Sequence, residues 1–198
     1  MNDGMKVGIF GGTFDPIHFG HLLLAEQARE AASLHEIWFI PAGEPPHKQG
    51  KPVTPAMERK KMVELAIEGH PQFKVNPIEL MRSGPSYTVD TIMELKKQNP
   101  HVEFFLLVGA DMVKNLPKWY KIKEIIQNVQ VIGLGRPGFD HDALPEYIEE
   151  RLMWIPDAVE TNISSSIIRE RLMLNRSVRY LVPDSVYKYI KEQGLYES

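Results

Sequence analysis

Residues 6–21 read KVGIFGGTFDPIHFGH, a short apolar run that leads into two glycines and ends on a pair of histidines. The β-branched and aromatic residues at 6–10 are typical of a buried strand. The leucines and alanines of residues 22–32 predict a helix directly afterwards. A strand, a glycine-containing turn and a helix in this order predict an α/β fold, and the glycines let the turn approach a phosphate at the helix N-terminus.

The same alternation continues along the chain. We expect further strands at residues 36–41, 73–80, 103–108, 129–134 and 153–156. We expect helices at residues 55–68 with Thr54 as cap, at 87–97, at 111–128 with an interruption at Pro117, at 164–174, and at 183–193 with Gly194 as stop. The pattern predicts a Rossmann-like doubly wound parallel sheet, with helices on both faces and a small helical C-terminal portion over residues 160–198.

Length, composition and charge limit the class of protein. A chain of 198 residues with 43% hydrophobic residues is expected to form one domain over residues 1–198, in which 1–4 are a disordered extension and the polar stretch 137–143 is a loop. The net charge of −3 offers no basic field, so we expect no nucleic-acid partner. Cysteine is absent, which excludes disulfides, thiolate zinc sites and a cysteine nucleophile. No signal-peptide pattern starts the sequence and no apolar run reaches the ~20 residues of a membrane span, so we expect a cytoplasmic protein without a membrane partner.

His18 and His21 lie three residues apart at the expected start of the first helix. Residues at this spacing share a helix face, so both imidazoles could donate hydrogen bonds to phosphoryl oxygens as charge develops in a transition state. Negative charge nearby would also favour their protonated forms. Two other interpretations stay open at this point: a turn with two solvated histidines, and a zinc site, for which the sequence offers no cysteine and no close third ligand.

A second helix start, residues 162–169, reads NISSSIIR. Any of its three serines could cap the helix, and Arg169 adds a positive charge one turn later. This helix start could hold an anion, or it could be capped in the ordinary way without one.

Residues 133–138 match G-x-G-x-x-G and follow an expected strand. However, Pro137 and the polar residues behind it do not open a helix there. A dinucleotide-binding fingerprint is therefore not expected at this position.

Three interior stretches offer groups for a second substrate. They are PPHK at residues 45–48, GPSYTVDT at 84–91 and GAD at 109–111, with Trp119 and Tyr120 shortly afterwards. The indole of Trp119 could stack on a flat heteroaromatic ring, and the Thr88 hydroxyl with helix-start amides could hold a carboxylate. Asp111 could accept ribose hydroxyl hydrogens, and Lys48 places a cation on a loop. Each of these residues also has an ordinary structural interpretation, as core, cap or solvated surface.

Together these motifs resemble a known family. HFGH at residues 18–21 is similar to the His-x-Gly-His motif of the nucleotidyltransferase superfamily, and ISSSIIR at 163–169 to its Ile-Ser-Ser-Thr-x-x-Arg motif, with Ser166 in place of threonine. With GGTFDP, PPHK, SYTVDT and GAD, the chain resembles the bacterial nicotinate mononucleotide adenylyltransferases over almost its whole length. The resemblance implies a nucleotidyltransferase domain that makes deamido-NAD and pyrophosphate from ATP and nicotinate mononucleotide, a step of NAD biosynthesis.

The resemblance also implies roles for individual residues. The mononucleotide phosphate attacks the α-phosphorus of ATP in line, without a covalent enzyme intermediate, and Mg²⁺ arrives with ATP and needs no metal ligands from the protein. The implied catalytic residues are His18, His21 and Arg169, assisted by Lys48. The implied ATP-binding residues are Gly11, Gly12, Thr13, Phe14, His18, Gly20, His21, Ile163, Ser164, Ser165 and Arg169. The implied nicotinate mononucleotide-binding residues are Gly12, Thr13, His47, Lys48, Tyr87, Thr88, Asp111, Trp119, Tyr120 and Arg136. In this set Trp119 stacks on the pyridine, Thr88 and the Tyr120 amide hold its carboxylate, and Arg136 assists at a phosphate.

Three other functions fit parts of the sequence. Another transferase of the superfamily, acting on phosphopantetheine or a phosphorylated alcohol, would not need Trp119 as a stacking face. A sensor module that binds ATP without turnover would not need two histidines at the phosphates. A fragment of a class I aminoacyl-tRNA synthetase would share the histidine motif, but this chain is too short and not basic enough to hold tRNA. The sequence is compatible with a homodimer and does not determine the oligomeric state.

Overall fold

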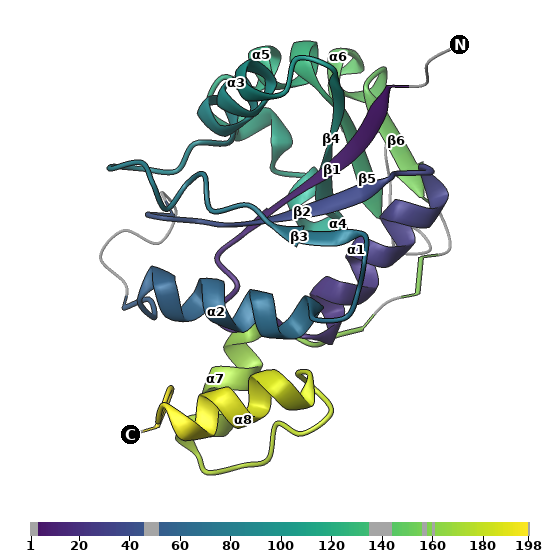
Figure 1. The fold of residues 1–198 in the computed structure, drawn as a ribbon. Helices are drawn as coiled ribbons and strands as arrows, with labels where there is room; N and C mark the ends of the chain where they lie inside the picture. Colours follow the sequence, from purple (N-terminus) through teal and green to yellow (C-terminus); the bar gives the residue numbers. More distant parts are fainter. Residues whose placement is uncertain (1–3, 46–51, 135–143, 156–157, 160, 198) are drawn as a thin grey trace.

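A six-stranded parallel sheet forms the centre of the molecule (Figure 1). The computed structural model describes residues 4–45, 52–134, 144–155, 158–159 and 161–197. The strands are β1 (Met5–Gly12), β2 (Glu36–Pro41), β3 (Phe73–Val75), β4 (Val102–Gly109), β5 (Gln130–Leu134) and β6 (Leu152–Ile155). Their order across the sheet is β3-β2-β1-β4-β5-β6, and every neighbouring pair is parallel. The predicted doubly wound parallel sheet is confirmed, and its strand order reverses between β1 and β4.

Helices cover both faces of this sheet (Figure 1). One face carries α1 (Phe19–Ala31) and α2 (Ala56–Ile67), whose buried residues share an apolar cluster with α7 (Ser165–Met173) and α8 (Asp184–Glu192). The other face carries α3 (Thr88–Gln98), α5 (Ile122–Asn128) and the short α6 (Glu146–Glu149). Residues 104–108 of β4 are each at most 4% exposed. A parallel strand covered on both sides needs such an unbroken apolar run.

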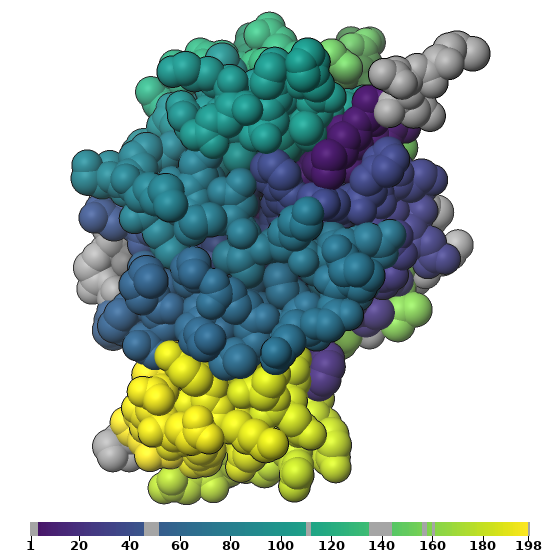
Figure 2. All heavy atoms as spheres, in the orientation of Figure 1, coloured from purple at the N-terminus to yellow at the C-terminus, as the bar shows by residue number. Residues whose placement is uncertain are grey.

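The C-terminal helices form a layer beneath α2 (Figure 2). The Tyr189 hydroxyl on α8 donates to a carboxylate oxygen of Glu58 on α2 at 2.7 Å, and Ser185 Oγ donates to the Leu65 carbonyl at 2.8 Å. Gly194 takes φ +61° just after α8, a left-handed conformation that favours glycine and ends the helix. Both helices predicted for this end of the chain are therefore present, and polar as well as apolar contacts join them to the body of the sheet.

The third strand is shorter than predicted. We expected residues 73–80, but β3 ends at Val75. Asn76 Oδ1 then accepts the backbone N–H of Ile78 at 3.1 Å, and the Leu80 N–H donates to the Pro77 carbonyl at 2.8 Å. An asparagine side chain and a proline without an N–H favour a turn over a ladder. The apolar alternation that suggested a longer strand reflects a turn that buries Ile78.

Thr54 does not cap α2 as predicted. Pro55 is the residue before the first turn, and no side chain caps it. Thr54 instead uses its backbone, since its N–H donates to Asp15 Oδ2 at 3.4 Å and its carbonyl accepts Arg59 Nε at 2.8 Å. A tertiary contact has therefore replaced the local cap.

The region expected at 111–128 is interrupted as predicted. It consists of α4 (Ala110–Val113), a 3-10 turn at Leu116–Lys118 and α5, with Pro117 inside the 3-10 turn.

The short helix α6 was not predicted. The predictions for residues 1–3 and 137–143 lie outside the described residues. Within the described part, no helix is both long and apolar enough to cross a membrane.

Candidate active site

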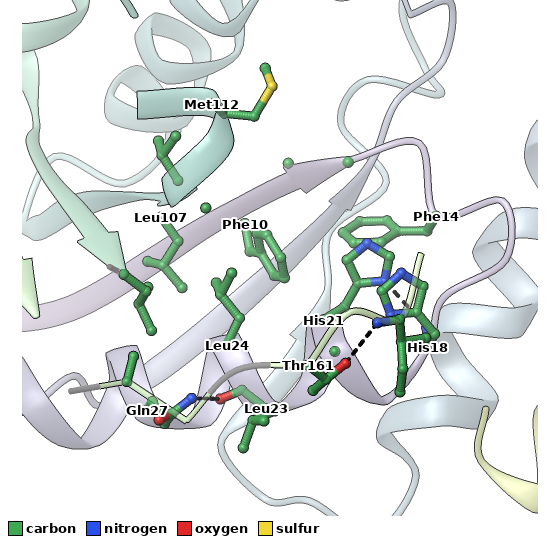
Figure 3. A pocket seen from close by; sticks show the side chains of 18 of the residues that line it. Phe10, Phe14, His18, His21, Leu23, Leu24, Gln27, Leu107, Met112 and Thr161 are labelled. Atoms are coloured by element: carbon green, nitrogen blue, oxygen red, sulfur yellow. Dashed lines mark hydrogen bonds between the residues drawn. The ribbon is translucent and has the colours of Figure 1, made fainter. Parts of the chain in front are cut away.

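The carboxyl ends of β1 and β4 open into a pocket where the strand order reverses (Figure 3). Ligands of open α/β sheets bind at such a point because the connections from the two central strands leave to opposite faces. The cavity measures about 380 Å³, which is within the usual range for small-molecule sites. It is lined by Phe10, Gly11, Gly12, Phe14, His18, Gly20, His21, Leu23, Leu24, Gln27, Leu107, Val108, Gly109, Met112, Trp119, Leu134, Ala158, Val159, Thr161 and Ile163.

The turn after β1 is shaped around the ring of Phe14. A Cβ added to Gly12 would lie 2.8 Å from that ring, so a side chain at this position would displace it. Phe14 has φ 50°, a left-handed conformation that costs a non-glycine residue free energy and persists only where packing determines it. Its ring contacts Phe10 and His21 edge-on, with centroid distances of 5.5 and 5.1 Å. Phe14 therefore supports the imidazole of His21 from the core side.

His18 and His21 stand together at the start of α1. Their rings stack with centroids 3.6 Å apart and planes 23° from parallel, and both face the pocket (Figure 3). His18 is the residue immediately before α1, and its backbone N–H donates to His21 Nδ1 at 3.2 Å. Because Nδ1 accepts this bond, the neutral His21 ring carries its hydrogen on Nε2. The spacing predicted a shared face, and the structure confirms it.

His18 is the more deeply buried of the two histidines, at 5% exposed. Burial lowers the pKa of His18 from 6.5 to about 4, because the imidazolium would lose its hydration. Its Nδ1 is buried without a hydrogen-bond partner in the described structure. His18 is therefore neutral at pH 7. The predicted preference for the protonated form depends on a phosphate being present.

The second motif, residues 163–169, lies directly against the turn between β1 and α1. This turn, residues 13–18, is called the first turn below. Ser164 caps α7 by accepting the Ile167 N–H at 3.2 Å, which settles which of the three serines is the cap. Ser165 Oγ donates to the Pro16 carbonyl at 2.9 Å, and Arg169 Nη1 donates to the Asp15 carbonyl at 2.7 Å. Two segments about 150 residues apart in the sequence are thus joined by side-chain-to-backbone hydrogen bonds, and α7 forms a second wall beside the turn.

Comparison with known proteins shows the family. The cytidylyltransferase-like family matches residues 9–171. A probable nicotinate-nucleotide adenylyltransferase of Geobacillus kaustophilus is 49% identical over 191 residues, which are 96% of this chain and 86% of that protein. The nicotinate-nucleotide adenylyltransferase of Bacillus subtilis is 47% identical over 193 residues, which are 98% of this chain and 99% of that protein. The chain belongs to the nicotinate-nucleotide adenylyltransferase family.

Solved structures show the same fold. The Plasmodium falciparum nicotinic acid mononucleotide adenylyltransferase complexed with NaAD superposes with a TM-score of 0.80 at 21% sequence identity. The superposition covers 96% of this chain and 97% of that chain. The two chains therefore share one fold over nearly their whole lengths, although their sequences have diverged widely.

The residues predicted to bind ATP fall into two groups in this family member. Gly11, Gly12, Phe14, His18, Gly20, His21 and Ile163 line the pocket. Thr13, Ser164, Ser165 and Arg169 do not line it. The Thr13 carbonyl, Ser165 and Arg169 instead take part in hydrogen bonds that hold the turn, whereas Ser164 caps α7.

The residues predicted to bind nicotinate mononucleotide are brought together only in part. Gly12 and Trp119 line the pocket. Tyr87 and Tyr120 lie outside the lining, and their rings contact each other with centroids 4.6 Å apart. Thr13 and Thr88, the latter the first residue of α3, are also outside it. His47, Lys48, Arg136 and the side chain of Asp111 fall outside the described residues.

Sequence reasoning missed the apolar wall of the pocket and the contact that closes it. Leu23 and Leu24 on α1 line the pocket with Ala158. Gln27 Nε2 donates to the Val159 carbonyl at 3.1 Å and its Oε1 accepts the Val159 N–H at 2.5 Å. A glutamine on a helix gives no signal of a partner 132 residues away, so only the fold reveals this pairing.

The two alternative sites find no support among the described residues. No three His, Cys, Asp or Glu side chains in that part of the chain converge as a metal site needs, so a zinc site at His18 and His21 lacks a third ligand there. Gly133, the first glycine of G-x-G-x-x-G, lies inside β5, where an added Cβ would be 2.8 Å from the ring of Trp154. This glycine permits close packing within the sheet.

We predict that His18 titrates near pH 4 in the nucleotide-free protein and near 6.5 in the unfolded chain. Between these pH values the unfolded chain binds the additional proton. The free energy of unfolding should therefore fall as the pH is lowered through this window, and His18 should contribute no pH dependence above it. NMR titration of the His18 ring and chemical denaturation of the His18→Gln variant, whose pH dependence should be flatter, check this. A His18 ring that titrates at 6.5 or above in the folded protein would contradict it.

Proposed function

We propose that this protein transfers the adenylyl group of ATP to nicotinate mononucleotide, forming deamido-NAD and releasing pyrophosphate. The observation that carries the proposal is the stacked pair His18 and His21, which faces a pocket at the switch point of the sheet together with Trp119. The names of the Geobacillus and Bacillus relatives, at 49% and 47% identity, support the same reaction. The pocket thus offers hydrogen-bond donors for phosphate oxygens and an aromatic face within one cavity.

The chemistry needs positioning and charge stabilisation rather than a protein nucleophile. A phosphate oxygen of the mononucleotide bonds to the α-phosphorus of ATP, and the bond from that phosphorus to the bridging oxygen of the pyrophosphate breaks. The attacking oxygen is already ionised at neutral pH, so no base is required. Correct orientation alone can lower such a barrier by roughly 7–11 kcal/mol. The protein's task is therefore to align the two substrates and to stabilise the charge that moves onto pyrophosphate.

The histidines and Arg169 would supply this stabilisation. Hydrogen-bond donors aimed at the developing charge are effective because they are already oriented before the reaction. His21 directs its Nε2 hydrogen away from the backbone, and the N-terminus of α1 adds its own partial positive charge. A phosphate beside His18 would raise the pKa of that ring from its low value, so binding of ATP would draw a proton onto it. We assign Gly11–Phe14, Gly20 and the start of α7 to the triphosphate, with Lys48 as an assistant.

The flat rings of both substrates suit the apolar parts of the pocket. Leu23, Leu24 and Ala158 offer an apolar wall for the adenine, and Trp119 offers a stacking face for the pyridine. We assign Thr88 and the Tyr120 amide to the pyridine carboxylate, next to the Tyr87 ring that packs on Tyr120. The further acceptor residues proposed are Thr13, His47, Lys48, Asp111 and Arg136.

Mg²⁺ would accompany ATP. This ion keeps several waters and takes phosphate oxygens readily, so it can bind through the triphosphate itself. Bound to the triphosphate, it would neutralise charge on the leaving pyrophosphate. His18, His21 and Arg169 would then complete the shell around the phosphates from the protein side.

The function is tested by incubating the protein with ATP, Mg²⁺ and one acceptor at a time, and measuring pyrophosphate. The acceptors are nicotinate mononucleotide, its amide analogue, phosphopantetheine and a phosphorylated alcohol. We expect pyrophosphate release and deamido-NAD with nicotinate mononucleotide. Turnover with phosphopantetheine or the alcohol instead would assign the protein to another branch of the superfamily, and binding of ATP without any turnover would make it a sensor.

The His21→Ala variant should keep its fold and lose about two orders of magnitude or more in kcat, because one well-aimed donor at a developing charge contributes this much. The measurement is steady-state pyrophosphate release, with circular dichroism to verify folding. The matched control is His101→Ala, since His101 is exposed just before β4, at the end of the sheet away from the pocket. Near-normal kcat in His21→Ala would remove this residue from the catalytic set.

The Thr88→Val variant should lose more kcat/KM for nicotinate mononucleotide than for its amide analogue. The Thr88 hydroxyl would donate to a negatively charged carboxylate in the acid but only to a neutral amide in the analogue, so its loss costs the acid more. We expect at least about a tenfold change in the ratio, in line with the 1.5–3 kcal/mol of a hydrogen bond to a charged group. Thr88→Ser keeps the hydroxyl and should retain the ratio. Equal losses for both acceptors would exclude Thr88 from carboxylate recognition.

A further inference from the structure

The carboxylate of Asp15 is 3% exposed, and the reaction described above makes no use of it. It lies in the first turn, three residues before His18. Its Oδ1 accepts the Tyr196 hydroxyl at 2.6 Å and its Oδ2 accepts the Thr54 N–H at 3.4 Å. Its backbone carbonyl accepts Arg169 Nη1 at 2.7 Å. One residue thus connects the C-terminal tail, the segment before α2, and the arginine assigned to the triphosphate.

Tyr196 reaches this turn from beyond the last helix. The Leu195 N–H donates to the Ile190 carbonyl at 3.0 Å, which folds the tail back on α8, and Lys191 pairs with Glu197 at 2.8 Å. Tyr196 itself has φ 64°, a left-handed conformation that a tyrosine keeps only where its surroundings hold it. Burial and the bond to Asp15 raise the pKa of the Tyr196 phenol, so it remains a hydrogen-bond donor at any pH near neutrality.

Arg59 completes the arrangement from α2 and is 1% exposed. Its guanidinium donates to the carbonyls of Thr54 at 2.8 Å, Thr13 at 2.8 Å and Gly43 at 3.3 Å. Burial lowers the pKa of Arg59, and the negative charge of Asp15 partly offsets this. A buried cation needs such a counter-charge and filled donor positions. Arg59 therefore holds the turn after β1 and the two chain segments that follow β2 and precede α2.

We propose that Asp15, Arg59 and Tyr196 form a positioning assembly that holds the first turn and Arg169 in the geometry required for ATP, so that the C-terminal tail takes part in adenylyl transfer. The proposal rests on the function proposed above. Tyr196 fixes the Asp15 carboxylate, and the Asp15 carbonyl then fixes Arg169. Arg59 fixes the Thr13 carbonyl two residues earlier. None of the three is a catalytic residue, since each acts through the turn that leads to His18.

The chain offers a matched control for Tyr196. Tyr189 lies on α8, and its hydroxyl donates to Glu58 on α2 at 2.7 Å. Tyr196 and Tyr189 therefore each make one tyrosine-to-carboxylate bond of nearly equal length between the C-terminal portion and the rest of the protein. Only the bond of Tyr196 ends on the first turn. A purely structural role predicts a loss of stability without a loss of activity for both, whereas a positioning role predicts a loss of activity for Tyr196 alone.

The test compares Tyr196→Phe with Tyr189→Phe in pyrophosphate release at saturating nicotinate mononucleotide. Both variants should lower the melting temperature, because each loses one bond to a carboxylate. Tyr196→Phe should also lower kcat/KM for ATP about tenfold or more, and Tyr189→Phe should stay within twofold of the unchanged protein. Similar activity losses in both variants, or activity within twofold for Tyr196→Phe, would overturn the proposal.

A readout without turnover separates this proposal from the proposed function. The ring signals of His18 and His21, recorded by NMR in the nucleotide-free proteins, should move in Tyr196→Phe and stay in place in Tyr189→Phe. Asp15→Asn, which keeps the size of the side chain but removes the charge beside Arg59, should move them as well. If the ring signals respond in this way but no pyrophosphate is released from ATP with nicotinate mononucleotide as acceptor, the proposed acceptor is wrong and the positioning assembly is still supported. If the rings stay unmoved in Tyr196→Phe, the assembly is wrong whatever the acceptor.

Discussion

The backbone carbonyls of the turn between β1 and α1 must find partners while the same turn lines the pocket at the switch point of the sheet. The structure meets this constraint with side chains from distant elements. Arg59 donates a hydrogen bond to the Thr13 carbonyl, Arg169 donates to the Asp15 carbonyl, and Ser165 donates to the Pro16 carbonyl. In a trans peptide the C=O and the following N–H point in opposite directions, so the bond from Arg59 to the Thr13 carbonyl directs the Phe14 N–H to the other side of the turn. The positions of His18, His21 and the start of α1 all depend on how this turn is held.

The same constraint explains why elements far from the pocket matter to it. α7 supplies two of these three donors, α2 supplies Arg59, and the tail after α8 supplies Tyr196. The C-terminal layer beneath α2 is therefore connected to the pocket by specific hydrogen bonds, in addition to the apolar cluster it shares with one face of the sheet. Each of these contacts uses a buried or half-buried polar group, and such a group is costly to leave without its partner.

Local patterns predicted most of the fold. β1, β2 and β4 each contain an unbroken apolar run, and their parallel order follows from the helices between them. The third strand was predicted too long because Ile78 is buried by a turn, and burial in a turn gives the same apolar pattern as burial in a strand. Of the site, His18 and His21 were predicted from their spacing and motif, and Trp119 was assigned to the same site by the family resemblance; all three line the pocket. The contacts of Gln27 with Val159, of Arg59 with Thr13 and of Asp15 with Tyr196 could not be predicted, since the partners lie 132, 46 and 181 residues apart and no periodicity records them.

We propose that the first turn, held in this way, is where the triphosphate binds. A crystal structure with a non-hydrolysable ATP analogue and Mg²⁺ tests it most directly. We expect phosphate oxygens within hydrogen-bond distance of the His18 and His21 rings, of the Gly11–Phe14 backbone and of Arg169, with the adenine against Leu23 and Leu24. A triphosphate bound elsewhere, with neither histidine ring in contact with a phosphate, would contradict this.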